Sequence, residues 1–180
     1  PPHLSPPPPA HPTVDGLVGS EMCIRDSTDY HRRMRLLRSG APRAVVRVSN
    51  TQVTCQLISY NPEGDSTIES VNGKSLVESY SWPADSSKKS VPACYLAGYA
   101  LGKKAIASGN SSAVLDIGLA ASSPGSRVFA ALRGMIDAGL EVPHGESVLP
   151  SEDRVKGEHI DNSQASAVEA SIQAIEEAHK

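Results

Sequence analysis

The sequence contains few aromatic and few cysteine residues. Aromatic side chains make up 4% of the 180 residues, with a single Trp and a single Phe. Its three cysteines, Cys23, Cys55 and Cys94, lie far apart, with no CxxC pair and no histidine at ligand spacing. Zinc sites and disulfide frameworks need paired, suitably spaced ligands. We therefore expect no metal site and no disulfide, which fits a reducing cytoplasm.

Long apolar runs are also missing. No run approaches the roughly 20 residues that cross a bilayer, and no charged-then-apolar leader is present. We therefore expect no membrane role. The length of 180 residues suits one domain with tails, because such a chain can enclose a single hydrophobic core.

The chain has no overall excess of basic residues, but its charge is unevenly distributed. Lys and Arg number 17 against 20 Asp and Glu, which gives a net charge of -3. Residues 28–104 carry +5, whereas residues 1–27 carry -2 and residues 105–180 carry -6. Only the local field acts within a Debye length of roughly 8 Å at physiological salt. The positive half can therefore approach phosphate, while the negative half stays solvated or faces a basic partner.

The basic residues gather between residues 28 and 50, where Asp29 is the sole carboxylate. Six arginines lie there: Arg32, Arg33, Arg35, Arg38, Arg43 and Arg47. Thr28 is expected to cap a helix, Asp29 suits its first turn, and Gly40 and Pro42 end it. The spacing predicts about three helical turns.

The two faces of this helix differ in chemistry and suggest different contacts. Tyr30, Met34 and Leu37 recur at the spacing of one face, which predicts that this face packs against the domain and orients the helix. The arginines cover the remaining surface. Guanidinium groups pair with phosphate in a fork and stack on bases, which favours an RNA-facing helix. A solvated basic helix is the alternative.

The next segments predict an antiparallel meander. Arg43–Asn50 and Val53–Tyr60 read as two strands joined by a hairpin turn, and 66–71 reads as a third. Residues 73–89 are predicted to form a loop, in which Trp82 packs on the core rather than stacking on bases. Lys88 and Lys89 in this loop either contact phosphate or are simply solvated.

A strand-helix-strand unit follows the loop. Ser90 and Pro92 open a helix that runs to Gly109, and its small-residue stripe is expected to let it lie close on a sheet. Residues 113–117 predict a strand parallel to an earlier one, and 126–138 predict a further helix. The predicted fold is a single compact α/β domain with tails, in which helices pack on a mixed sheet.

The SSPGSR turn before the last of these helices is the one feature that could mimic an enzyme. Backbone amides at a helix N-terminus attract phosphate, so a phosphotransferase or ATPase fragment is the alternative in another class. The turn lacks the Lys-Ser or Lys-Thr of a phosphate loop. Asp116 has no acidic or histidine partner at catalytic spacing, so we expect it to form hydrogen bonds at a strand end. We predict no catalytic residue and no cofactor.

Several collinear motifs carry a family resemblance. TDYHRRMRLLRSGAPRAVVRVSN, YLAGYALGKKA, AVLDIGL, SPGSRVFAALRGMIDAGLEVPHGE and RVKGEHI resemble the archaeal and eukaryotic-type ribosomal protein L-eighteen family over residues 28–160. The resemblance implies a non-enzymatic constituent of the large subunit of the cytoplasmic ribosome. Its implied partners are 5S rRNA, large-subunit rRNA and neighbouring large-subunit proteins, with attachment of 5S rRNA in the central protuberance.

The resemblance also implies RNA-contacting residues. Beyond the six arginines, these are Asn50, Lys88, Lys89, Ser126 and Arg127. The first hairpin departs from the family, which places basic residues around a turn where this chain has Val48, Thr51 and Gln52. We therefore expect fewer phosphate contacts at that turn.

The two ends of the sequence are expected to be tails. Residues 1–27 are proline-rich and have no helical or strand period, which predicts a disordered tail. Ser20 to Ser27 resembles a translated sequencing-adapter read-through, so we expect residues 1–27 to be non-native and the family's basic arm to be absent. Residues 161–180 are predicted to be an acidic tail or a short docking helix. A protein-binding adaptor role for the acidic half is a further alternative.

Overall fold

The computed structural model describes residues 28–158 and 162–179. Its elements follow in this order: α2 (Tyr30–Leu37), β1 (Arg43–Val48), β2 (Val53–Ser59), β3 (Ser66–Asn72), α3 (Gly73–Ser79), α4 (Val91–Ala107), β4 (Val114–Asp116), α5 (Arg127–Asp137), the 3-10 turn η1 (Glu146–Val148), α6 (Glu152–Lys156) and α7 (Asn162–Ala178). No helix in these two ranges is long and apolar enough to cross a bilayer. The predicted tail at residues 1–27, including Cys23, lies outside the described residues.

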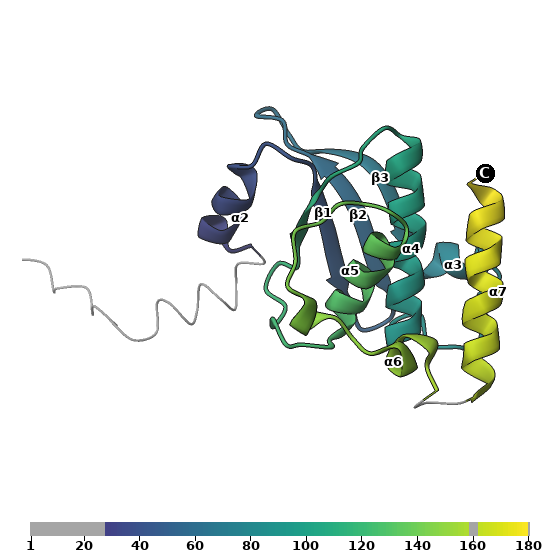
Figure 1. The fold of residues 1–180 in the computed structure, drawn as a ribbon. Coiled ribbons are helices and arrows are strands. Elements are labelled where there is room, and N and C mark those ends of the chain that lie inside the picture. Colours follow the sequence, from purple (N-terminus) through teal and green to yellow (C-terminus); the bar gives the residue numbers. More distant parts are fainter. Residues whose placement is uncertain (1–27, 159–161, 180) are drawn as a thin grey trace, which may run out of the picture.

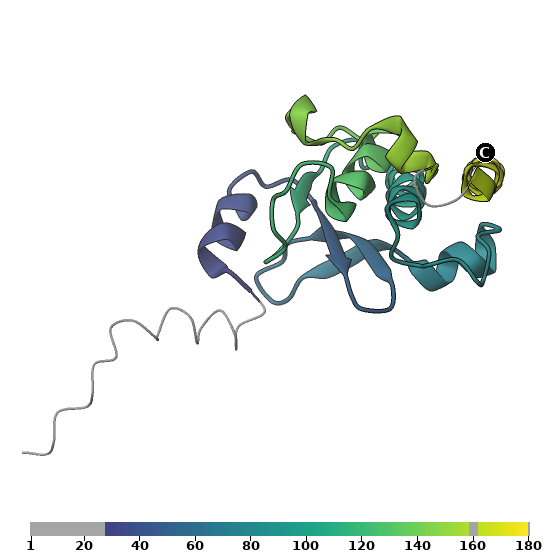
Figure 2. The ribbon, with the colours of Figure 1, turned by 90° about the horizontal axis from the view of Figure 1, so that it is seen from below.

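The sheet is mixed, as the sequence predicts. Its strand order is β3-β2-β1-β4. β1 pairs antiparallel with β2, for example Val46 opposite Cys55, and parallel with β4, for example Ala44 opposite Leu115. Figures 1 and 2 show α4 and α5 over one face of the sheet, α7 outside α4, and α2 apart on the opposite side of the domain. The predicted meander and strand-helix-strand unit are confirmed.

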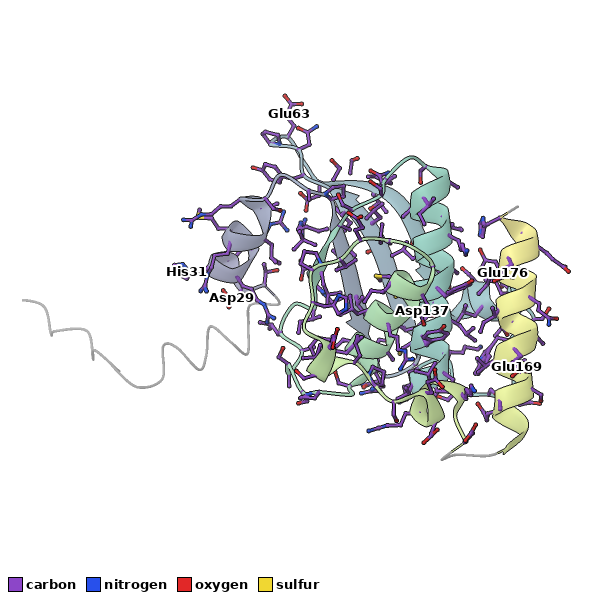
Figure 3. All side chains as sticks on the ribbon, in the orientation of Figure 1. Asp29, His31, Glu63, Asp137, Glu169 and Glu176 are labelled. Atoms are coloured by element: carbon purple, nitrogen blue, oxygen red, sulfur yellow. The ribbon has the colours of Figure 1, made fainter. Side chains whose placement is uncertain are left out.

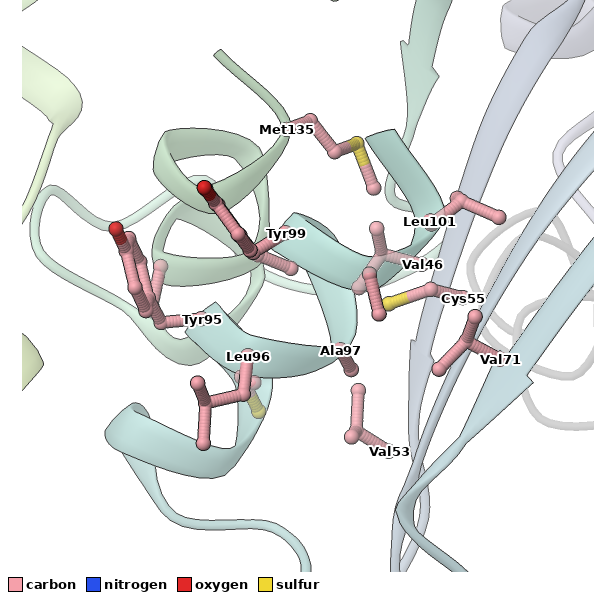
Figure 4. Close-up of a cluster of buried hydrophobic side chains, with 14 of the residues drawn as sticks. Val46, Val53, Cys55, Val71, Tyr95, Leu96, Ala97, Tyr99, Leu101 and Met135 are labelled. Atoms are coloured by element: carbon pink, nitrogen blue, oxygen red, sulfur yellow. The ribbon is translucent and has the colours of Figure 1, made fainter. Parts of the chain in front are cut away.

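The core lies between the sheet and α4. Val53, Cys55 and Leu57 alternate on β2 and are fully buried, as period-two patterning requires. Figure 4 shows Val53 and Cys55 facing α4, with Ala97 directed towards Val53. Cys55 and Cys94 are free and buried, and burial raises the pKa of the Cys94 thiol to about 12.

Glycines set the distance between α4 and α5. A Cβ added to Gly98 would collide with the backbone of Ala131, and a Cβ added to Gly134 would collide with the backbone of Tyr95. Gly98 on α4 and Gly134 on α5 therefore allow the two helix backbones to touch. The sequence predicts close packing of α4 on a sheet, but its glycines face a helix instead. Ala97 of α4 meets the sheet in Figure 4.

The segment 73–89 is not entirely a loop, contrary to the sequence prediction. Its first seven residues form α3, whose N-terminus is capped by Asn72. The Asn72 Oδ1 accepts hydrogen bonds from the backbone N–H groups of Lys74 (3.0 Å) and Ser75 (2.8 Å). Asn72 also ends β3, so one residue closes a strand and opens a helix. Trp82, at 2% exposure, packs in the core as predicted.

Replacing Asn72 with Ala should lower the free energy of unfolding by about 1 kcal/mol, because a capping side chain contributes about that much. Urea unfolding of the full chain would measure the change. Asn72→Asp keeps an acceptor for both N–H groups and should retain most of the stability. An equal loss in both variants would contradict the capping role.

The C-terminal helix α7 packs on α4. Val168 and Ile175 are buried and Ile172 packs against the core. The Tyr99 hydroxyl donates to Glu176 Oε1 at 2.9 Å. Burial, the bond to Glu176 and nearby negative charge raise the pKa of Tyr99 to about 12. Glu176, one of the acidic residues of α7, thus attaches this helix to α4.

Candidate nucleic-acid interface

The N-cap of helix α2 lies one residue later than the sequence predicts. Asp29, not Thr28, occupies the N-cap, and its Oδ1 accepts from the backbone N–H of Arg32 at 3.0 Å. The helix has eight residues and is therefore shorter than the three turns predicted. Gly40 at φ +68 ends the turn that follows, and Pro42 precedes β1.

The orientation of α2 is the opposite of the one that its apolar spacing predicts. Tyr30 is 67% exposed and Met34 is 63% exposed, so these two side chains do not anchor the helix, whereas Leu37 is half-buried. Arg32 and Arg33 are instead half-buried against the domain. The neighbouring surface explains the difference, because it offers the Asp65 carboxylate to Arg33 and the Gly118 carbonyl oxygen to Arg32.

The inward arginines join a network of ion pairs and hydrogen bonds. Arg33 Nη2 lies 2.7 Å from Asp65 Oδ2, and Arg43 Nη2 lies 2.6 Å from the same oxygen. Arg32 Nη1 donates to the Gly118 carbonyl oxygen at 2.9 Å. α2 is therefore attached to the β2–β3 turn through Asp65 and to the segment after β4 through Gly118.

Arg43 and Asp116 form the buried end of this network. Arg43 is 3% exposed, and its Nη1 lies 2.9 Å from Asp116 Oδ2. Arg47 Nη2 lies 3.0 Å from Asp116 Oδ1, which also accepts from the Gly118 N–H at 2.9 Å. Asp116 thus joins two arginines of β1 at the end of β4.

The charge of Asp116 is stabilised. Burial raises the pKa of Asp116, but Arg47, the Gly118 N–H and the hydrogen bonds from both arginines outweigh burial and lower it. A carboxylate whose two oxygens are already occupied is poorly suited to act as a base or to bind a metal. The predicted hydrogen-bonding role of Asp116 at a strand end is confirmed. The described ranges contain no group of three or more acidic, histidine or cysteine side chains that could hold a metal ion.

A groove gathers three of the predicted RNA-contacting residues. Arg47, Ser126 and Arg127 line it, together with apolar side chains that include Val48 and Leu119, and it encloses about 670 Å³. Ser126 is the N-cap of α5 and Arg127 is exposed at its first position. The Arg47 side chain remains 46% exposed although it pairs with Asp116.

The other predicted contacts lie beyond the far end of β1. Lys89 Nζ donates to the Asn50 carbonyl oxygen at 2.7 Å, which ties the hairpin turn to the segment before α4. The Lys88 carbonyl oxygen accepts from the Val53 N–H at 3.0 Å. Asn50, Lys88 and Lys89 therefore form a cluster separate from α2.

Arg35 and Arg38 are the exposed cations of α2. Neither forms an ion pair within the described part of the chain, and both are exposed on the helix face that also carries His31. In Figure 3 the labelled His31, on the same side, points away from the domain. Asp65 and Gly118 could not be predicted from the sequence as partners of α2, because a turn aspartate and a loop glycine carry no signal of their distant arginine partners.

Comparisons with known proteins identify the family. A family model described as "Ribosomal large subunit proteins 60S L5, and 50S L18" matches residues 107–145. Large ribosomal subunit protein uL18 from Halobacterium salinarum is 50% identical over 133 residues, which cover 74% of this chain and 71% of that protein. The proteins of the same name from Haloferax volcanii and Methanoculleus marisnigri are also 50% identical over 133 residues, covering 71% and 74% of their lengths.

A domain that displays unopposed arginines on a peripheral helix is typical of proteins that meet a polyanion. The sequence identity to these relatives over most of the chain defines the family: the chain belongs to the uL18 family of large ribosomal subunit proteins. Membership confirms the predicted family and the predicted localisation to the cytoplasmic ribosome. It also implies ribosomal RNA and ribosomal proteins as partners.

Proposed function

We propose that the chain binds 5S rRNA and helps attach it to the large-subunit rRNA in the central protuberance of the subunit. The observation that carries this proposal is the outward display of Arg35 and Arg38 on a helix that has no exposed carboxylate beyond its capping Asp29. Family membership and the motif resemblance from TDYH to RVKGEHI support the choice of RNA. The role is binding to RNA and to neighbouring large-subunit proteins, without catalysis or a cofactor.

The arginines divide into two groups in this proposal. Arg35, Arg38 and Arg127 are exposed, and Arg47 has a side chain that is 46% exposed although its guanidinium bonds to Asp116 and to the Val46 carbonyl. These four arginines are assigned to RNA phosphates, with Asn50, Lys88, Lys89 and Ser126 as further contacts. Arg32, Arg33 and Arg43 hold α2 in place through Asp65, Asp116 and Gly118. Phosphate contacts set the position of the protein on RNA, so a rigidly held helix helps to define that position.

The proposal is tested by binding of the full chain to folded 5S rRNA across a salt series, with a tRNA as competitor. Tight, salt-sensitive binding that the tRNA does not displace is expected. Binding to 5S rRNA that is no tighter than binding to tRNA would overturn the proposal for this chain.

Removing both exposed arginines of α2 should weaken this binding. For the double variant Arg35→Ala, Arg38→Ala, the slope of log K against log salt should fall by roughly 1.5, because each lost phosphate contact contributes about 0.7–0.9. A matched control is Lys74→Ala on α3, which removes a 71% exposed cation on the other side of the domain. An unchanged slope in the double variant would place the RNA elsewhere.

A further inference from the structure

The outer side of α2 carries Tyr30 and Met34, two large and largely apolar side chains that are exposed. Successive residues of a helix turn by about 100°, and this spacing places Tyr30, Met34, Arg38, His31 and Arg35 in sequence around one half of the circumference. All five are exposed. The half-buried Arg32, Leu36, Arg33 and Leu37 occupy the other half. The helix therefore holds arginines inward and presents a tyrosine and a methionine to solvent.

The inward arginines make this orientation specific. Arg32 is bound to the Gly118 carbonyl and Arg33 to Asp65, at 2.9 and 2.7 Å. Rotating α2 to bury Tyr30 would break both contacts and leave Asp65 with Arg43 alone. The exposure of Tyr30 and Met34 is thus imposed by polar contacts on the opposite side of the helix.

We propose that Tyr30 and Met34 form a stacking surface for unpaired nucleotides of RNA. This inference rests on the proposed function and specifies that α2 binds unpaired rather than double-helical RNA. Tyr30 and Met34 are one turn apart, so their side chains adjoin and offer a continuous ring and thioether surface. Arg38 follows one turn later, and its planar guanidinium extends the same row.

Charge favours RNA as the occupant. Arg38 and Arg35 follow the apolar pair around the outer half of the helix, which bears no carboxylate. Asp29 lies at the N-terminus, where its Oδ1 is engaged by the Arg32 N–H. Two apolar side chains with unpaired guanidinium groups beside them match a base and a neighbouring phosphate, because aromatic stacking and phosphate pairing occur together in single-strand recognition.

Unpaired nucleotides fit this surface better than a duplex. In A-form RNA the bases stack on each other, and the major groove is too deep and narrow for side chains to read. A tyrosine ring can stack only on a base that is free of its neighbours, whereas arginines can pair with phosphates of either form. Tyr30 should therefore add affinity for loops and single strands only.

The test compares Tyr30→Ala with Tyr30→Phe in the full chain against three probes. The probes are folded 5S rRNA, an unstructured single-stranded oligonucleotide and a blunt RNA duplex. Tyr60→Ala is the matched control, since Tyr60 is 53% exposed beyond the end of β2 and carries no adjacent arginine in sequence. Both tyrosines are exposed, so neither replacement should unfold the chain, and a change in Kd reports a change in RNA binding.

Tyr30→Ala should raise the Kd for 5S rRNA and for the oligonucleotide by about tenfold, the loss expected for one stacked base. The salt slope should stay unchanged, because no phosphate contact is removed. Tyr30→Phe and Tyr60→Ala should bind like the unmodified chain, and duplex binding should not change in any variant.

Three results would overturn the stacking surface. Tyr30→Ala could bind like Tyr60→Ala, it could lose duplex affinity equally, or Tyr30→Phe could lose as much, which would indicate a hydroxyl hydrogen bond. Failure of the 5S rRNA proposal is distinct, because it appears as equal affinity of the unmodified chain for 5S rRNA and tRNA. The oligonucleotide still tests Tyr30 in that case.

Discussion

Replacing Gly98 with Ala is expected to lower the free energy of unfolding by about 3 kcal/mol, the upper part of the range for overpacked cores. For a domain of this size the corresponding decrease in Tm is about 6–12 °C. The added Cβ would meet the oxygen, carbonyl carbon and Cα of Ala131. These are backbone atoms, so no side-chain rotation can relieve the collision, and α5 must move away from α4.

The reciprocal glycine gives the same expectation. A Cβ on Gly134 would meet the Tyr95 oxygen and the Tyr99 nitrogen, which belong to the backbone of α4. α4 also packs on β2 and β3, so displacing α5 separates it from a helix that cannot itself shift. Met135 and Leu132 of α5, both essentially fully buried, would lose contacts in the process.

Thermal and urea unfolding of the full chain would measure these changes. Gly145→Ala is the matched control, because a Cβ there meets nothing within 4 Å and the backbone has φ -96, which alanine adopts readily. It should change stability by less than about 0.5 kcal/mol. An equally small change for Gly98→Ala would mean that α4 and α5 can separate without cost.

The sheet and α4 could be predicted from sequence because their signals are local. Alternating apolar residues on β2 and the Ser90 N-cap before a long apolar helix do not depend on the neighbours that eventually pack there. The parallel pairing of β4 with β1 follows from the helix between them. These features could be read from residue order alone.

Helix α3 was missed because its sequence looks like a loop. It begins at Gly73 and contains two serines, which are weak helix formers, and its Asn72 cap lies inside the end of β3. Tertiary packing decides the outcome: Leu76 is fully buried in the core. Propensity summed over seven residues carries too little information to reveal such a helix.

The orientation of α2 could not be predicted for a different reason. Apolar periodicity identifies the packing face only if the surface below is apolar. Here that surface contains Asp65, 32 residues away from Arg33, and the Gly118 carbonyl, 86 residues away from Arg32. Six arginines in one segment indicate an electrostatic role. The sequence does not indicate which of these arginines form ion pairs within the protein. The RNA-contacting residues chosen from sequence therefore stay predictions.

The second large effect is expected for Asp116→Asn, which should lower the free energy of unfolding at neutral pH by about 3 kcal/mol. Removing one partner of a buried ion pair leaves an uncompensated charge. Arg43 would keep only Asp65, and its side chain is 3% exposed. The amide has the same shape as the carboxylate, so the loss reports charge and hydrogen bonding rather than a cavity.

The pH dependence provides a check on that cause. The pKa of Asp116 is lower in the folded chain than its ordinary value of 3.8, since Arg47, the Gly118 N–H and Arg43 together outweigh burial. Its contribution to stability is therefore complete above pH 3.8 and is lost as the pH falls through the folded-state pKa. Unfolding free energies measured from pH 7 down to pH 2 should show the gap between the unmodified chain and Asp116→Asn narrowing below about pH 4.

Asp85→Asn separates this effect from a general change in charge. Asp85 is exposed in the segment before α4 and forms no ion pair within the described residues, so its replacement should change stability by less than about 0.5 kcal/mol at every pH. A gap for Asp116→Asn that stayed constant down to pH 2 would mean that the charge of Asp116 is not what holds Arg43 and Arg47. Because those two arginines lie beneath α2, a loss of charge at Asp116 should also weaken RNA binding, whereas Asp85→Asn should not.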